Sequence, residues 1–371
     1  MKKQLFSVSV IAICLLSSCA QTPDSIQGNN YNTDLNLNDK VPVEHILDDF
    51  DEAFKTEYTK FKLPDKSSVI INQPEGVYDL ELKYVNSEKS LEWLKEKVFK
   101  LAEIFNVENN GNAENIGNIG YGLENDKGKV RADVFSEPYY CTKDNMEWDL
   151  MNVTQVEYID RINPEKRDKK YKNIIEKAQK LSNEINSLMD GALINNAIEI
   201  YIKNYKNKIY YDIYLQPTYK GLGIQCITPT YSNGDIFEGD NALMTMSMYM
   251  NIMYDSDLNL IAYISSNNYT PVKEEVIDKL ISFKGACDIL EEELASNVRM
   301  EFDDVKLWYE PRGTILDATT EDGFDGSKTT KCTPKWFFIS DNEEDSGLHH
   351  AINYVTVDCV TGEIEVFFPG N

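Results

Sequence analysis

The sequence predicts an α+β protein made of tandem units, each with one helix packed on an antiparallel sheet. Two observations lead to this class. Stripes of apolar residues at helical spacing are followed by runs that alternate with period two, and this order occurs twice in succession. Repeated helix-then-strands order indicates α+β architecture and not a doubly wound parallel sheet. The expected regions are 1–18, 19–40, 41–165, 166–270 and 271–371.

Region 1–18 is predicted to be a lipoprotein signal peptide. Two lysines precede an apolar run from Leu5 to Leu16, which is shorter than the roughly 20 residues that span a bilayer. Leu16-Ser17-Ser18-Cys19 resembles the lipobox at which bacterial lipoproteins are cut and diacylated on cysteine. We therefore expect a lipid on Cys19 that anchors the chain to the outer face of the cell membrane. The alternative is an ordinary secretory signal with an incidental cysteine.

The polar segment at 19–40 is expected to be a flexible tether, because it has too few apolar residues to offset the entropy of ordering. Lys2 and Lys3 leave with the signal. The mature chain therefore keeps 35 of the 37 basic residues and all 62 acidic ones, which gives it a formal charge of −27. This charge argues against nucleic acid as a partner. It also opposes adhesion to anionic lipids, so the membrane attachment is assigned to the lipid.

The elements of region 41–165 follow from periodicity. Helical stripes cover 43–54 and 90–105, alternation predicts strands at 77–85 and 130–135, and an Asn- and Gly-rich stretch predicts a loop at 107–129. In region 166–270 a helix begins near Lys172 and Gly191 is a plausible stop. Strands are expected there at 197–202, 210–215, 243–254 and 260–264.

Region 271–371 repeats the order. Ser282 is the expected N-cap of a helix whose stripe runs from Phe283 to Leu294. Strands are predicted at 298–309, 334–340, 353–358 and 363–368, the last two joined by a Thr361-Gly362 turn.

This last region resembles PepSY-like domains. The resemblance is carried by the helix that contains Ala286, by Leu307-Trp308-Tyr309-Glu310-Pro311, by Pro334-Lys335-Trp336-Phe337-Phe338, and by Asp358-Cys359-Val360-Thr361-Gly362-Glu363-Ile364, which follows the family's D-x-x-T-G-x-I hairpin. The middle region looks like a more divergent copy. Tandem units also make the chain similar to extracytoplasmic regulators that restrain a Gram-positive cell-wall sensor kinase, and to uncharacterised Gram-positive lipoproteins. The resemblance implies binding or inhibition and carries over no catalytic residue.

The five cysteines that remain after processing show no CxxC spacing and are expected to be mostly reduced and buried. Cys332 with Cys359 is the pair to test first for a disulfide. Asp255, Asp257 and Asn259 have the first spacings of a calcium loop, but Leu260 stands at the sixth position, so a hairpin turn is expected.

Four residues are candidates for ligand or partner contacts. Tyr139 and Tyr140 follow Pro138 in an expected loop, and His349 and His350 lie in an acidic stretch. Exposed imidazoles near carboxylates can bind metal, although paired surface histidines are more often plain surface residues. No catalytic, cofactor or metal site is predicted.

The expected function is a non-enzymatic binding or regulatory module that acts on another extracytoplasmic protein. It is motivated by the anchor, the repeated units and the lack of a catalytic motif. Two alternatives stay open. One is a solute- or glycan-binding lipoprotein, and the other is a hydrolase with an unfamiliar carboxylate site.

Overall fold

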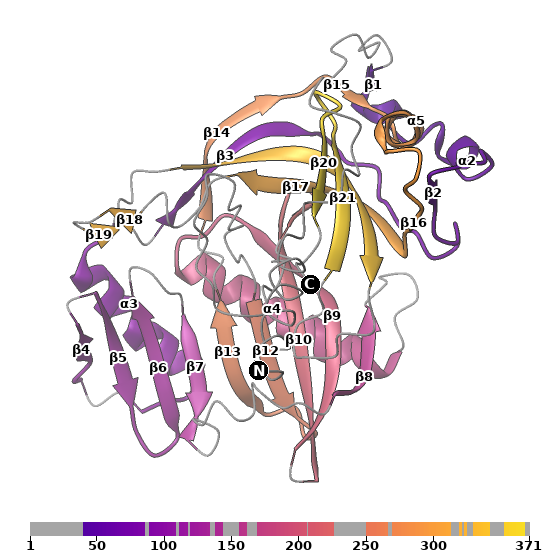
Figure 1. Cartoon of the computed structure of the whole chain (residues 1–371). Helices are drawn as coiled ribbons and strands as arrows, with labels where there is room; N and C mark the ends of the chain where they lie inside the picture. The colour runs from indigo at the N-terminus through magenta and orange to yellow at the C-terminus, as the bar shows by residue number, and fades with distance from the viewer. Residues whose placement is uncertain are drawn as a thin grey trace, which may run out of the picture.

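The computed structural model describes residues 40–85, 89–108, 111–117, 119–133, 138–143, 156–161, 169–205, 207–225, 250–265, 269–312, 319–320, 323–324, 329–341 and 352–367. In this part the chain is α+β, mostly strands with four α-helices, and most strands join one large, mostly antiparallel sheet (Figure 1). None of the described helices is both long and apolar enough to cross a membrane. The predicted signal peptide and nearly all of the tether lie outside the described residues.

The described helices are η2 (Val43–His45, a 3₁₀ helix), α2 (Phe50–Ala53), α3 (Leu91–Ile104), α4 (Lys169–Leu188) and α5 (Phe283–Glu293). The strands up to α4 are β1 (Lys40–Pro42), β2 (Phe61–Lys62), β3 (Tyr78–Tyr84), β4 (Glu114–Ile116), β5 (Gly120–Glu124), β6 (Gly128–Asp133), β7 (Tyr139–Thr142) and β8 (Val156–Arg161). Those between α4 and α5 are β9 (Ile194–Tyr205), β10 (Lys208–Tyr219), β11 (Leu222–Ile224), β12 (Met250–Asp255), β13 (Leu260–Ser265), β14 (Tyr269–Val276) and β15 (Lys279–Ile281). The last are β16 (Met300–Glu301), β17 (Asp304–Arg312), β18 (Thr319–Thr320), β19 (Gly323–Phe324), β20 (Thr329–Asp341), β21 (Ile352–Asp358) and β22 (Ile364–Phe367).

In the described residues the large sheet has sixteen strands, of which twelve follow the order β14-β3-β20-β17-β11-β10-β12-β13-β7-β6-β5-β4. Strands β21 and β22 continue from β20, and β9 and β8 continue from β10. Within this sheet β11 and β17 form a parallel pair. The short strand β11 therefore joins the middle part of the sheet to its C-terminal part.

Each of α3, α4 and α5 is followed by an antiparallel meander. The meanders are β4-β5-β6-β7, β9-β10-β12-β13 and β17-β20-β21-β22. Figure 1 shows α4 lying across the strands of its meander. The helix-then-strands order predicted for the last two regions is confirmed at this level, and most predicted strands coincide with observed ones.

The helices cover one face of the sheet because alternate strand residues are apolar. Ile213 and Leu215 of β10 join the hydrophobic cluster beneath α4, whereas Asp212 between β9 and β12 points to the other face. In β20, Trp336 and Phe338 join the cluster beneath α5, and Lys335 points away from it. The side of the sheet that none of the described helices covers is called the polar face below.

The hydrophobic clusters cut across the expected region 41–165. Leu80 and Leu82 of β3 pack in the same cluster as α5, and β3 pairs with β14 and β20 from the C-terminal part of the chain. Leu94 and Val98 of α3 instead pack with α4 and β12. Region 41–165 thus contributes to two hydrophobic clusters. Its strand β3 pairs with strands from far along the chain, whereas its helix α3 packs with the middle part.

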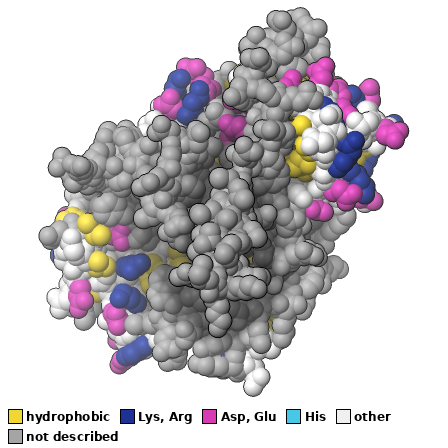
Figure 2. All heavy atoms as spheres, in the orientation of Figure 1, with side chains coloured by type: hydrophobic (Ala, Val, Ile, Leu, Met, Phe, Trp, Pro, Cys, Tyr) yellow, Lys and Arg dark blue, Asp and Glu magenta, His cyan; other side chains and the backbone are white. Residues whose placement is uncertain are grey.

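The N-terminal described residues wrap around α5. Strand β1 pairs with β15, and the Asp49 carboxylate accepts a hydrogen bond from the Ser282 hydroxyl at the start of α5. At the other end of the helix, Glu291 accepts the backbone N–H of Thr59 at 3.0 Å. The single helix predicted at 43–54 is therefore two short pieces, η2 and α2, bent to follow α5. Figure 2 shows acidic and basic side chains mixed on the surface near α2 and α5.

Two predicted helix starts are confirmed, and one predicted stop is corrected. The Ser90 and Ser282 side chains accept N–H bonds from Trp93 and Gly285 at the first turns of α3 and α5. Helix α4 ends at Leu188, and the left-handed residue after it is Asp190, with φ 63°, instead of Gly191. Asp tolerates this conformation better than most residues because its short polar side chain bonds locally.

The loop predicted at 107–129 is wrong. Strands β4 and β5 and the start of β6 occupy it. The glycines serve close strand contacts: a Cβ on Gly120 would lie 2.3 Å from Cβ of Asp133 on the paired strand. Gly117, at φ 58°, lies between β4 and β5. Composition favoured a loop, but the backbone needs glycine there for close approach.

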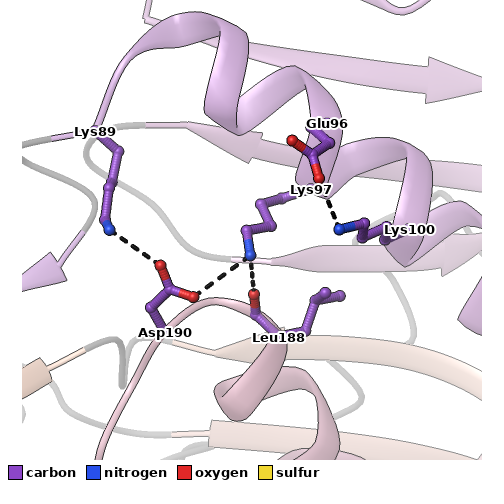
Figure 3. A network of polar contacts seen from close by, with 6 residues as sticks. All are labelled: Lys89, Glu96, Lys97, Lys100, Leu188 and Asp190. Carbon is purple, nitrogen blue, oxygen red and sulfur yellow. Dashed lines mark hydrogen bonds and ion pairs between the residues drawn. The ribbon is translucent and has the colours of Figure 1, made fainter.

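A charged network joins α3 to the end of α4 (Figure 3). Lys97 donates to the Leu188 carbonyl at 2.5 Å and lies 3.5 Å from Asp190, which Lys89 approaches at 3.0 Å. A cation at the carbonyl end of a helix stabilises the helix, because this end carries the negative end of the helix dipole. Desolvation acts to raise the pKa of Asp190, but the hydrogen bond from Lys89 and the charge of Lys97 outweigh it and lower the pKa.

We expect Asp190→Asn to reduce the free energy of unfolding by less than about 1 kcal/mol at pH 7, because exposed ion pairs are screened. A lowered folded-state pKa stabilises the protein above the ordinary carboxyl value of about 3.9. That contribution is lost as the pH falls through the folded value, so wild type and variant should converge below about pH 4. Urea unfolding at pH 7 and pH 3 measures this. A difference that stayed constant across this range would contradict the assignment.

Candidate functional site

The polar face carries buried polar and charged side chains where an open sheet face would present solvated ones. Its fully or nearly fully buried members include Asp212, Gln216, Gln225, Asn251, Glu310, Lys335 and Thr356. Removing such groups from water is costly unless they are paired. A face that keeps several of them beside aromatic rings is therefore the strongest candidate for a functional site in the described part of the chain.

The Lys335 cluster lies in the C-terminal part of this face. Lys335 is 0% exposed and forms ion pairs with Glu310, 1% exposed, and with Glu365. Nearby, Gln225 Nε2 donates to the Tyr354 hydroxyl at 2.7 Å. One ammonium group thus holds two carboxylates, a pairing that offsets the cost of burying Lys335 and Glu310.

Aromatic rings lie beside this cluster on three adjacent strands. The Trp308 and Phe337 ring centroids are 5.6 Å apart, and those of Phe337 and Tyr354 are 5.5 Å apart. A Cβ on Gly223 would come within 2.8 Å of Cδ1 of Trp308. The glycine therefore lets the indole lie directly over β11, and Trp308 stays partly exposed.

A second buried ion pair lies in the middle part of the face. Lys203 of β9, 4% exposed, pairs with Asp212 of β10, 0% exposed, and Asn251 Nδ2 donates to the same carboxylate. The Asn251 Oδ1 atom is buried and accepts no hydrogen bond. This amide oxygen is therefore an unsatisfied acceptor beside the ion pair, among the residues that the structure describes.

Next to this pair, one row of side chains crosses five strands. Cross-strand registers place Arg131 of β6 opposite Tyr139, Tyr139 opposite Ile264, Ile264 opposite Asn251, and Asn251 opposite Tyr214. These five residues are called the Arg131 row. Four strand spacings make it about 19 Å long. All members except buried Asn251 are partly exposed.

Stacked rings define the ends of the row. The Arg131 guanidinium lies 4.8 Å from the Tyr139 ring centroid, and the Tyr214 ring packs edge-on against Tyr201 at 5.0 Å. Burial, together with neighbouring Cys141, raises the pKa of Tyr139 to about 12. Its phenol is therefore neutral. Figure 2 shows hydrophobic, basic and acidic side chains close together over β4 to β7.

The four predicted contact residues have different outcomes in the structure. Tyr139 and Tyr140 lie on strand β7, so the expected loop position is wrong for both. Tyr139 belongs to the Arg131 row, whereas Tyr140 is 6% exposed and stacks on Phe105 at 4.5 Å in the core. His349 and His350 lie outside the described residues, as does Cys19.

The Asp255 segment is a hairpin turn, as predicted. Asp255 Oδ1 accepts the backbone N–H groups of Asp257 and Asn259 at 2.9 and 2.8 Å. Across the described ranges, no three His, Cys, Asp or Glu side chains are grouped so as to hold a metal ion.

The cysteines that the structure describes are free and buried: Cys141, Cys287, Cys332 and Cys359. This confirms the expectation for those four, and the Cys332–Cys359 disulfide is not formed. Burial raises the pKa of each of these thiols. Neutral thiols in apolar surroundings react slowly. Cys226 lies outside the described residues.

Sequence reasoning missed Arg131, Lys203, Asp212 and Lys335. Each of them shows one signal in the sequence. It is a charged residue within a strand whose other residues are apolar or alternate between apolar and polar. Lys335, set within Pro334-Lys335-Trp336-Phe337-Phe338, is the clearest case. Such a charge is normally solvated on an open face, which is why pattern alone did not single it out.

Comparison with known proteins assigns no family. No family model matches the chain, and no curated protein matches it. A crystal structure of an uncharacterized protein from Eubacterium rectale ATCC 33656 is similar, with a TM-score of 0.49 and 14% sequence identity, covering 84% of this chain and 92% of that one. The PepSY-like resemblance stays a prediction.

Proposed function

We propose that this chain is an extracytoplasmic lipoprotein, anchored through a lipid on Cys19, that binds another envelope protein and is not an enzyme. Its units are taken to be PepSY-like helix-on-sheet modules. The observation that carries the binding role is the Arg131 row: a partly exposed line of aromatic, amide and guanidinium groups on the polar face of the sheet.

The composition of the row favours a protein partner. Tyrosine and arginine are enriched at the energetic centres of protein interfaces, because they combine a large contact area with directional hydrogen bonds. Tyr139 and Tyr214 offer ring surface, and Arg131 offers donors. A row about 19 Å long matches an extended segment of about six residues.

The buried charges support a role without catalysis. Lys335 and Lys203 are each committed to carboxylates, and the described cysteines are protonated and buried. A general base or nucleophile needs a free, reachable atom next to its substrate. The acidic chain, with formal charge −25 including the signal residues, is also suited to stay clear of anionic lipid while the lipid tether holds it.

Site-specific photocrosslinking tests this function. A photoreactive phenylalanine at Tyr214 should capture one envelope protein reproducibly in intact cells, since this ring lies on the polar face. The same probe at Ile209, on the same strand and 42% exposed but facing the opposite side, is the matched control. Cys19→Ser should leave the precursor uncut and remove the chain from its lipid anchor, which lowers the yield of the adduct.

Equal adducts from both positions, or no protein adduct at Tyr214, would contradict a protein-binding role. The second candidate, a solute- or glycan-binding lipoprotein, is favoured by the aromatic rings beside the Lys335 cluster. It predicts a thermal shift with cell-wall fragments that Trp308→Ala abolishes.

A further inference from the structure

Within the part of the chain that the structure describes, Arg131 is a cation without a carboxylate partner, in a chain rich in carboxylates. The sequence has 62 acidic and 37 basic residues, yet among the described residues Arg131 forms no ion pair. Its Nε atom is buried and donates to no acceptor. A buried guanidinium donor without an acceptor is costly, and none of the described residues supplies that acceptor.

The neighbours of Arg131 leave this group unsatisfied. Lys129, two residues earlier on the same strand face, pairs with Glu124 at 3.3 Å. Opposite Arg131 on β5 stands Gly122, which has no side chain, and opposite it on β7 stands Tyr139. The Arg131 guanidinium lies over the Tyr139 ring, and a guanidinium stacked on a ring can still bind a planar acceptor through its N–H edge.

We infer that the Arg131 row recognises an extended acidic segment of the partner protein, with one carboxylate bound to the Arg131 guanidinium. This inference rests on the proposed protein-binding function. Guanidinium and carboxylate match in geometry and form paired hydrogen bonds. The charge complementarity is local, since Arg131 is a single cation on a strongly acidic chain.

A second atom of the row fits the same ligand. The Asn251 Oδ1 atom is buried without a donor and lies three strand spacings from Arg131, about 14 Å. An extended peptide covers that distance in about four residues. The carboxylate at Arg131 and a backbone N–H at Asn251 would therefore come from one segment that crosses the strands.

A polyanion is the less suitable ligand. The formal charge, −25 for the whole sequence and −27 without the signal, repels a polymer with many phosphates, and repulsion grows with each added charge. One carboxylate in a mainly neutral segment meets Arg131 without that penalty.

Peptide binding tests the inference. The full chain would be titrated with three labelled heptapeptide pools, Ac-XXXEXXX-NH2, Ac-XXXQXXX-NH2 and Ac-XXXKXXX-NH2, in which X is a mixture of neutral residues. Fluorescence anisotropy should show the Glu pool binding at least about tenfold more tightly than the Gln pool, with the Lys pool weakest. Arg131→Gln should abolish the preference, and Arg131→Lys, which keeps the charge but loses the planar fork, should retain only part of it.

Lys129→Gln is the matched control, because it removes the same charge from the same strand face and should preserve the preference. Tyr214→Ala should weaken the Glu and Gln pools equally. If the pools bind alike and Tyr214→Ala weakens all of them, the carboxylate inference is overturned while protein binding stands. If no pool binds, or only poly(glycerol phosphate) binds, both are overturned.

Discussion

Lys335→Met is expected to lower the free energy of unfolding by about 3–5 kcal/mol. Methionine keeps the aliphatic stem of the side chain but removes the ammonium group between Glu310 and Glu365. Glu310 is 1% exposed, so its carboxylate would stay buried without its cation. Urea unfolding, followed by tryptophan fluorescence, measures the change through the shift in midpoint.

Two further variants make this result interpretable. Lys331 lies on the same strand and face, but its partner Asp79 is 3.5 Å away and both side chains reach solvent. Lys331→Met should therefore lower the free energy of unfolding by less than about 1 kcal/mol. The double variant Lys335→Met/Glu310→Met should recover much of the stability, because a buried ion pair can be replaced by apolar groups. A double variant as unstable as Lys335→Met alone would show that lost packing, and not an unpaired charge, causes the effect.

Trp336→Ala is the second substitution with a large expected effect. It should lower the free energy of unfolding by about 3–5 kcal/mol. Trp336 follows Lys335 on β20 and points to the opposite face, where it is 0% exposed and packs 5.4 Å from the Phe283 ring of α5. Removing the indole leaves a cavity at the centre of the cluster beneath this helix. Thermal and urea unfolding should both report the loss.

Trp336→Phe separates packing from hydrogen bonding. The indole N–H donates to the Ile281 carbonyl at 2.9 Å, and phenylalanine keeps most of the ring while leaving that carbonyl unpaired, at a cost of about 1–3 kcal/mol. Trp308→Phe, at a partly exposed position of the polar face, is the control and should cost less. Equal losses for Trp336→Phe and Trp308→Phe would contradict the central role given to Trp336.

Local elements were largely predictable because their signals are local. The apolar stripe of α3, with its Ser90 cap, and the stripe of α5, with its Ser282 cap, can be read from a few neighbouring residues. The Asp255 turn and the Gly362 turn, at φ 78°, are equally local. The loop expected at 107–129 failed for the converse reason: Gly120 is glycine because Asp133 on the next strand leaves no room for Cβ.

The candidate site was only partly predictable. Tyr139 was singled out, but for an expected loop position, and its pairing with Arg131 depends on the register of β6 and β7. Tyr140 looked equivalent in sequence, yet strand alternation sends it into the core. The other members of the Arg131 row come from β12, β13 and β10, between 83 and 133 residues along the chain from Arg131.

By itself, the sequence determined the α+β class, the main helices and strands, the acidic character of the chain and the expectation of a lipid on Cys19. These depend on composition and on periodicities that span a few residues. Only the tertiary structure decided that β3 joins the C-terminal strands, that Lys335 and Lys203 are buried beside carboxylates, and that Arg131 has no such partner among the described residues. Whether a charge is solvated, paired or left for a ligand depends on which distant strand lies next to it.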